Sequence, residues 1–315
     1  MNHRCLINRL RKHAPVSAAA LMTTLALLSA SASRSVAFAT ETSPAGQGTG
    51  TSSIPAVPQA ESTKVLKATP ASPVSKTFGI SAEVAGTSNF APADSTDHKA
   101  VMVFRLRPTC KLSDLWTLAL GMSVSKGLTQ ARETTLKDSS LSLALMSQPI
   151  GPALNSNSRA VIVLPTSEIS RKELSLLGSV GVQQAFVFKP ATVNTFEATY
   201  VFKAQKDFYQ YRVSTLGESN QSLGIVNALG LAYLPNDKWR LDMAAGPGLS
   251  WTYEGNSQTL YSINEELSYT FNAALSTAIG HTNAGEAFKD NGRSANISLF
   301  NGYSSTFYGT LTYTY

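Results

Sequence analysis

The sequence predicts an all-β fold, a transmembrane antiparallel up-and-down β-barrel of about 12 strands, within a range of about 10–14. Three observations predict this fold. Beyond residue 75, segments of roughly ten residues recur in which apolar and polar side chains alternate. Clusters of Gly, Pro, Asn and Asp separate these segments. The last segment ends at the last residue of the chain, and its alternation is strict.

The bulk composition is compatible with such a barrel. Mean hydropathy is −0.04 and charged residues make up 15% of the chain, as in many soluble proteins. These values do not exclude a membrane barrel, because only one face of each of its strands is apolar. Outside the N-terminus there is no uncharged apolar run of about 18 residues, so strands, and not helices, are expected to cross the membrane.

Residues 1–39 have the pattern of a secretory signal peptide. Four basic residues precede a short apolar stretch at 16–30, and Ala37-Phe38-Ala39 forms a small-residue cleavage site before Thr40. Removing this segment removes five basic residues and no acid, which leaves 21 basic and 20 acidic residues. A nearly neutral chain gives no reason to expect a nucleic-acid partner.

Residues 40–75 are rich in Pro, Ser, Thr, Ala and Gly and contain no aromatic residue. Such a segment cannot bury enough apolar surface to fold, so we expect it to be disordered. After cleavage Cys110 is the only cysteine, which excludes an internal disulfide and a zinc site built on cysteines. We expect no metal and no cofactor.

The strands follow in order from residue 76 to residue 315. They are expected at 78–84, 102–107, 116–124, 141–145, 159–164, 174–188, 196–202, 223–233, 239–253, 263–271, 275–279 and 305–315. Gly246-Pro247-Gly248 interrupts one of them. Proline cannot donate a hydrogen bond to the ladder, so a bulge or a local gap in pairing is expected there.

The connections predict the two ends of the barrel. Short turns are expected at 109–113, 190–192, 235–238 and 272–274, with a longer one at 150–158. The opposite end should carry the long loops 126–138, 207–221 and 282–303 and two short ones near 167–172 and 254–258. Aromatic residues should mark both edges of the apolar band, with Trp251, Tyr253 and Tyr209 at the loop end.

The last strand carries the most specific signal. Phe307, Gly309, Leu311, Tyr313 and Tyr315 fall on one face, and hydroxyl-bearing residues fill the other. This strand resembles the C-terminal β-signal of bacterial outer-membrane β-barrel proteins, although that family usually ends in Phe. The resemblance implies a location in the bacterial outer membrane, with residues 40–75 in the periplasm. It further implies contact with outer-membrane lipid and recognition by the β-barrel assembly machinery; the oligomeric state stays open.

The face opposite the apolar one should line the lumen. The charged residues expected there are Glu83, Arg105, Arg107, Glu197, Lys203, Arg240, Asp242 and Glu266. Two interpretations stay open at this point. These residues can be ion pairs that join the strands, or they can form a solute path in which Arg105, Arg107 and Arg240 face acids.

We expect a porin-like passive channel for small polar solutes. The first alternative is a non-conducting barrel for surface recognition or envelope structure, with 282–303 as a polar binding loop. The second is a barrel hydrolase, which needs a histidine beside a nucleophile or an acid. After the signal peptide the chain has only His98 and His281, near expected strand ends, and no motif assigns them a nucleophile. We therefore expect no enzymatic activity.

Overall fold

The structure, a computed structural model, describes residues 77–92, 95, 97–129, 132–190, 195–288, 294–301 and 304–315. The expected signal peptide (1–39) and the Pro/Ser/Thr-rich segment (40–75) lie outside these residues. In the described part of the chain no helix has both the length and the apolar character needed to cross a membrane.

Thirteen strands and one short π-helical turn make up the described fold. They are β1 (Phe78–Asn89), β2 (Ala100–Lys111), β3 (Trp116–Gly127), β4 (Thr134–Leu136), β5 (Ser139–Pro149), β6 (Leu154–Leu164), η2 (Ile169–Glu173), β7 (Leu176–Phe188), β8 (Phe196–Tyr209), β9 (Gln221–Tyr233), β10 (Trp239–Thr252), β11 (Ser257–Thr270), β12 (Leu275–Glu286) and β13 (Thr306–Thr314).

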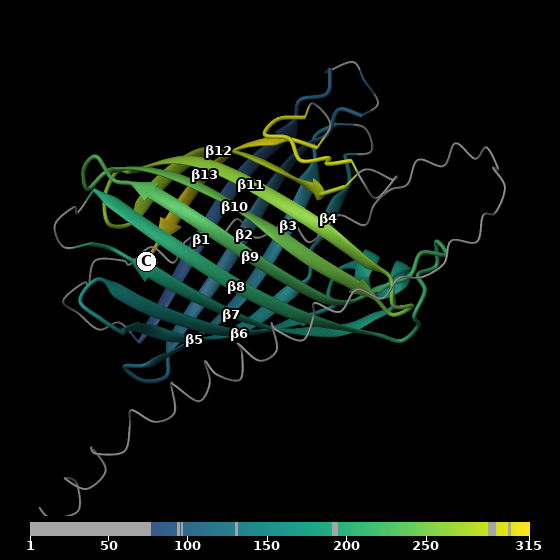
Figure 1. The fold of residues 1–315 in the computed structure, drawn as a ribbon, viewed down its shortest axis with the longest axis horizontal. Coiled ribbons are helices and arrows are strands. Elements are labelled where there is room, and N and C mark those ends of the chain that lie inside the picture. The colour runs from purple at the N-terminus through teal and green to yellow at the C-terminus, as the bar shows by residue number, and fades with distance from the viewer. Residues whose placement is uncertain are drawn as a thin grey trace, which may run out of the picture. The chain divides into compact units, whose positions relative to one another are not determined.

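Twelve of these strands form a closed antiparallel wall (Figure 1). Each strand pairs with its neighbours in sequence, and β13 pairs with β1, which closes the ring. At the seam the Tyr315 amide donates to the Ile80 carbonyl at 2.9 Å. The short β4 pairs only with β3, so it is not one of the twelve strands of the wall. The predicted fold class and the predicted number of strands are therefore confirmed.

The two ends of the wall differ as predicted. On the end that holds the start of β1 and the end of β13, the connections are 112–115, 150–153, 189–195, 234–238 and 271–274. The other end carries 90–99, 128–138, 165–175, 210–220, 253–256 and 287–305. Several bounds differ from those expected: 109–113 is 112–115, 207–221 is 210–220, and 282–303 is 287–305 because β12 continues to Glu286. The turn at 150–158 is only 150–153, because β6 begins at Leu154, and the loop near 167–172 spans 165–175 and contains η2.

The burial pattern is the reverse of that in a water-soluble β-sandwich. Inner positions of the wall are small and buried, as at Ala85, Ala119, Ser142 and Ser179, which are at most 5% exposed. The outer positions are large, apolar and exposed. They include Phe78, Ile80, Val84, Met102, Phe104, Ile162, Val182, Leu229, Leu231, Leu241, Met243 and Ile279. Because water disfavours such a surface, this outer face suits hydrocarbon.

The expected irregularity at Pro247 is a gap in the ladder without a bulge. Residue pairs between β10 and β9 pass from Ala245–Leu229 directly to Gly248–Val226, and the register does not change. Pairing with β11 continues through Pro247. At Pro247, β10 is therefore paired with β11 but not with β9, as expected for a residue without an N–H group.

Candidate functional site: the inner wall and the outer mouth

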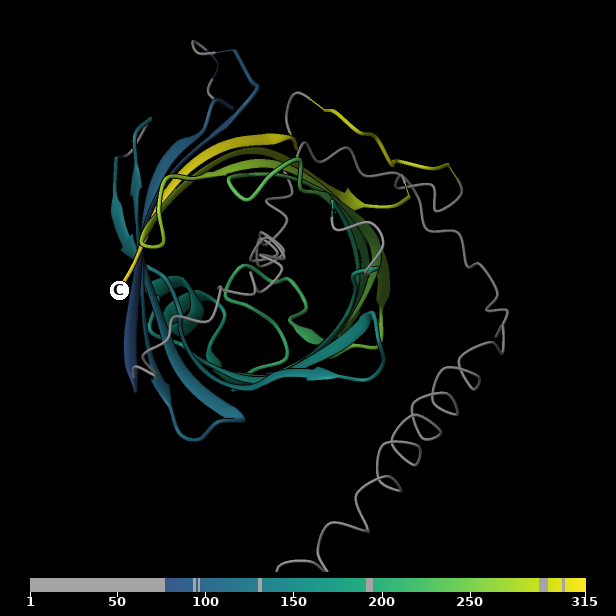
Figure 2. The same ribbon diagram turned by 90° about the vertical axis from the view of Figure 1, so that its left-hand side faces the viewer.

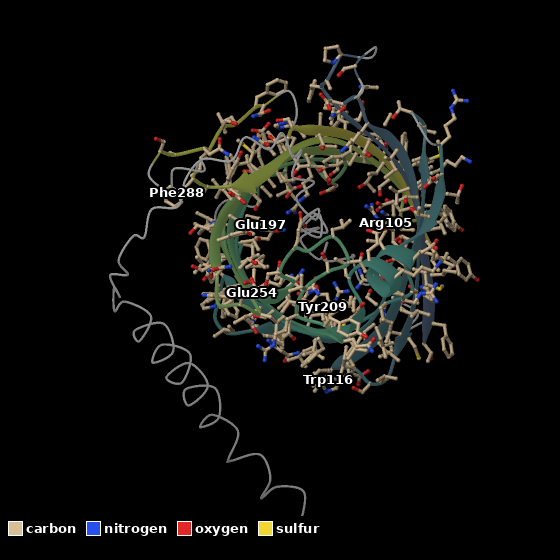
Figure 3. All side chains as sticks on the ribbon, turned by 90° about the vertical axis from the view of Figure 1, so that its right-hand side faces the viewer. Arg105, Trp116, Glu197, Tyr209, Glu254 and Phe288 are labelled. Carbon is tan, nitrogen blue, oxygen red and sulfur yellow. The ribbon has the colours of Figure 1, made fainter. Side chains whose placement is uncertain are left out.

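Strand alternation places the predicted charged residues on the inner face. Figure 3, an end-on view, shows Arg105 and Glu197 inside the ring of strands and Trp116 outside it. Arg107 shares the inner face of β2 with Arg105, and Lys203 shares that of β8 with Glu197. The structure places seven of the eight predicted residues in two groups on different parts of the wall, and Lys203 lies on β8 outside both groups.

The first group is centred on Arg240 of β10. Its Nε donates to both carboxylate oxygens of Asp242 at 2.8 Å, and its Nη2 donates to Glu197 of β8 at 3.1 Å. The side chains of Arg240 and Glu197 are each 11% exposed and that of Asp242 is 20% exposed. One guanidinium is therefore shared by two carboxylates that belong to strands two apart in the wall, and it joins β8 to β10 across β9.

Tyr308 extends this group towards β13. Its hydroxyl lies 2.9 Å from Glu266 and 3.2 Å from Asn264, and Glu266 is the cross-strand partner of Asp242. The tyrosine ring crosses the inner face over Gly280, where an added Cβ would lie 2.3 Å from the ring. Glycine at 280 is therefore what allows the tyrosine of β13 to reach the acid of β11 across β12.

The second group lies at the seam. Arg105 of β2 forms an ion pair with Glu83 of β1, and the Thr312 hydroxyl of β13 lies 3.4 Å from the other carboxylate oxygen of Glu83. Glu83 is 8% exposed. The side chain of Arg105, in contrast, is 42% exposed, so part of its guanidinium faces the interior of the barrel.

The expected cluster of three arginines is therefore divided. Arg240 is enclosed by its two acids, and β11, β12, β13 and β1 separate it from β2. Arg105 and the half-buried Arg107 form the basic part of the inner wall on β2. The ion pairs of Arg240 and of Arg105 join strands, as the first interpretation predicts, and the solute path stays a prediction.

The end of the barrel that carries the long loops, which we call the outer mouth, contains features that the sequence did not predict. In the two end-on views η2 lies within the outline of the ring (Figures 2 and 3). Asp138, immediately before β5, holds this turn, because its carboxylate accepts from the Ser167 amide at 2.9 Å and from the Ser170 hydroxyl. Ser175, between η2 and β7, has a φ of 55°, a left-handed conformation that non-glycine residues seldom adopt.

The loop 210–220 packs against η2. The Thr215 amide donates to the Glu173 carbonyl at 2.9 Å, and the Asn220 side chain donates to the Leu174 carbonyl at 3.2 Å. On the surface of η2, Lys172 lies 2.5 Å from Glu168 and holds the pKa of that carboxyl below its usual value. Two loops from opposite sides of β7 thus narrow the mouth together.

Two predicted aromatic positions were wrong. Tyr209 shares the inner face of β8 with Asp207, and Figure 3 shows it inside the ring. The Tyr253 hydroxyl donates to the Asp207 carbonyl at 2.7 Å, and the Tyr209 and Tyr253 rings meet edge to face. Both residues therefore support the mouth from inside, because β10 shifts register after Trp251 and β8 reaches further than predicted.

His281 also lies elsewhere than expected. It is within β12 and not at a strand end, and its outward side chain lies 3.8 Å from Glu265 of β11. Its Nε2 is buried and has no hydrogen-bond partner among the described residues. His98 lies in the 90–99 loop and its Nδ1 is 3.0 Å from the Ala91 carbonyl. No group of three or more potential metal ligands occurs in the described part of the chain.

No protein-family model matches the sequence, and no curated protein matches it. Solved structures do match. The COG4313 outer membrane channel from Pseudomonas putida F1 aligns with a TM-score of 0.54 at 15% identity, over 79% of this chain and 98% of that chain. The NanC porin aligns with a TM-score of 0.46 at 9% identity, over 74% of this chain and 98% of that chain. The KdgM porin in complex with disordered oligogalacturonate aligns with a TM-score of 0.45 at 8% identity, over 75% of this chain and 99% of that chain.

These matches are outer-membrane porin-like β-barrels, so the expected resemblance is confirmed at the level of the fold. At 15% identity the first match establishes a shared architecture and no shared solute. The two lower TM-scores add no argument about function. What the barrel does has to be inferred from its own residues.

Proposed function

We propose that the protein is a passive outer-membrane channel for small polar solutes. The observation that supports this most is the contrast between the two faces of one closed wall: charged and hydroxyl side chains face inward, and large apolar side chains face outward. A sealed cylinder of this kind can expose water to a polar wall inside a bilayer, and diffusion along that wall requires no bound cofactor and no catalysis.

Planar-bilayer recording tests the proposal. Purified, leader-free protein should give steady, ohmic current steps. A protein that inserts but stays silent would support the alternative of a non-conducting recognition or structural barrel. N-terminal sequencing of the exported chain tests cleavage before Thr40.

The basic part of β2 should set the selectivity among small ions. Two unit charges about 4 Å apart interact by about 1 kcal/mol in a water-like medium, which corresponds to roughly fivefold in a permeability ratio. Arg107→Glu replaces a positive charge with a negative one, so it should shift the reversal potential in a KCl gradient towards the equilibrium potential of K⁺, by at least about fivefold in permeability ratio. Lys238→Glu, in the exposed turn before β10, makes the same charge change outside the lumen and should leave the potential unchanged.

The terminal strand is proposed as the signal for assembly, with Tyr315 as its end. Tyr315 is 65% exposed, so Tyr315→Asp removes little packing, while it places a charge at the recognised terminus. We expect export to proceed and the heat-modifiable, membrane-inserted form to fall several-fold relative to Tyr315→Phe. Equal insertion of the two variants would contradict the assignment.

A further inference from the structure

The outer face of the wall carries a polar patch on β11 and β12, towards the loop end of these strands. Alternation puts Tyr261 and Glu265 on the outward face of β11 with Ile263 and Leu267, and puts His281 and Asn283 on the outward face of β12 with Ile279. Hydrocarbon disfavours these side chains. Yet Asn283 is 0% exposed and Tyr261 is 8% exposed, so something other than lipid covers them.

The cover is the segment 294–301, which we call the outer strap, from the connection between β12 and β13. In both end-on views this yellow segment lies outside the ring (Figures 2 and 3). Asn283 anchors it: its Nδ2 donates to the Ser298 carbonyl at 2.7 Å and to the Tyr261 hydroxyl at 3.3 Å, and its Oδ1 accepts from the Ser304 hydroxyl at 2.7 Å. Every polar atom of this side chain thus has a partner in the wall or the loop.

Aromatic rings continue the attachment towards the middle of the wall. The Phe300 ring of the strap stacks on the His281 imidazole at 5.8 Å and meets Phe90, from the loop after β1, at 4.6 Å. Phe90 in turn lies 6.4 Å from Phe307 of β13. The strap is therefore fixed to β12, and through Phe90 to the seam.

The strap reaches down into the level of the apolar band. His281 is six residues beyond the start of β12, about 20 Å along the strand and about 15 Å along the axis of a barrel with tilted strands. The apolar band of such barrels is about 25 Å tall. Phe300, which packs on His281, therefore lies below the upper edge of the band.

Three large apolar side chains of the strap stay more than half exposed, although Phe300 also packs on His281. Ile297, Leu299 and Phe300 are 57%, 69% and 56% exposed. The strap thus binds the polar patch of the wall with its backbone and hydroxyl groups and presents apolar side chains in place of that patch. This surface continues the apolar outer face of the strands.

We propose that the outer strap is embedded in the outer leaflet, where Ile297, Leu299 and Phe300 contact the acyl chains of the lipid. The proposal rests on the proposed location of the barrel in a membrane. Its occupant is hydrocarbon, because the side chains of Ile297, Leu299 and Phe300 carry no polar group, they lie at the depth of the acyl chains, and they extend an outer face of the same character.

Nitroxide labels in proteoliposomes test this directly. In a Cys110→Ser background, a label at Leu299→Cys should be relaxed more by oxygen, which concentrates in hydrocarbon, than by a water-soluble nickel complex. A label at Leu216→Cys is the matched control, because Leu216 is 66% exposed but belongs to the loop 210–220 at the mouth. This label should be relaxed more by the nickel complex than by oxygen. Adding Asn283→Ala, which removes the anchor, should move the label at 299 several-fold towards nickel.

A third label, at Leu229→Cys on the outward face of β9, separates the possible failures. If the label at 229 is relaxed more by oxygen while the label at 299, like that at 216, is relaxed more by nickel, the strap lies in water and the proposal is overturned. If position 299 is shielded from both reagents, protein covers it, for example a second copy, and the proposal is equally overturned. If position 229 favours nickel, the barrel itself is not in the bilayer, and the membrane location fails together with the strap.

Discussion

Replacing Arg240 with methionine is expected to lower the free energy of unfolding of the barrel by about 3–5 kcal/mol. The guanidinium is 11% exposed and is the shared partner of Glu197 and Asp242. Methionine fills a similar volume but leaves two carboxylates close together without a cation, so both lose their pairing and repel each other. Equilibrium unfolding by urea in lipid vesicles, followed by tryptophan fluorescence, measures the loss.

Two further variants show whether the loss comes from the charges. Arg105→Met removes an arginine whose side chain is 42% exposed and leaves only one buried carboxylate, that of Glu83, without this cation, so it should cost less than Arg240→Met, about 1–3 kcal/mol. Adding Glu197→Gln and Asp242→Asn to Arg240→Met removes the uncompensated charges and should restore most of the stability. A loss at Arg240 no larger than the loss at Arg105 would show that the buried triad is not a main connection between β8 and β10.

Gly246→Ala is expected to prevent most of the protein from forming the closed barrel. A Cβ at this position would lie 1.8 Å from the Asn227 carbonyl oxygen and 2.6 Å from the Ala228 Cα, both in the backbone of β9. Neither atom can move without separating the strands, and the ladder is already interrupted at Pro247. Overpacking of this kind costs about 1–3 kcal/mol even where side chains can adjust, and here the backbone has to move.

The shift between heated and unheated bands on a gel measures the folded fraction. Gly86→Ala is the matched control, because Gly86 lies on the outer face of β1 and an added Cβ would meet nothing within 4 Å. The control should fold as well as the original chain. Normal heat-modifiability of Gly246→Ala would mean that β9 and β10 do not approach as closely as described.

Much of the wall could be predicted because side chains along a strand point to the same face at every second residue. Alternation alone assigns Arg240 and Asp242 to one face of β10, and it assigns the large apolar residues to the other face. The partner of Arg240 on β8 could not be predicted. Glu197 is 43 residues away, and the contact depends on the register of β8 with β9 and of β9 with β10. Register follows from how the turns place the strands, which a single sequence determines poorly.

The loops were harder to predict for a different reason. Their conformations depend on contacts with residues that are distant in the sequence, such as Asp138 for η2 and Asn283 for the outer strap. The polar residues at the start of 282–303 favoured a solvated loop, and they obscured the apolar run Ile297-Ser298-Leu299-Phe300 in the same segment. That run was the available signal, since a water-exposed loop seldom carries three large apolar residues in four.

Chemical labelling of paired positions on β1 tests the closed wall, with lipid outside and water inside, most directly. Ser81 and Thr87 face inward, and Ile80 and Val84 face outward and are 39% and 41% exposed. Each would be changed to cysteine in the Cys110→Ser background and exposed, in proteoliposomes, to a water-soluble maleimide. We expect positions 81 and 87 to react and positions 80 and 84 to be protected by the bilayer. Equal reaction at all four positions, or faster reaction at 80 and 84, would contradict the account.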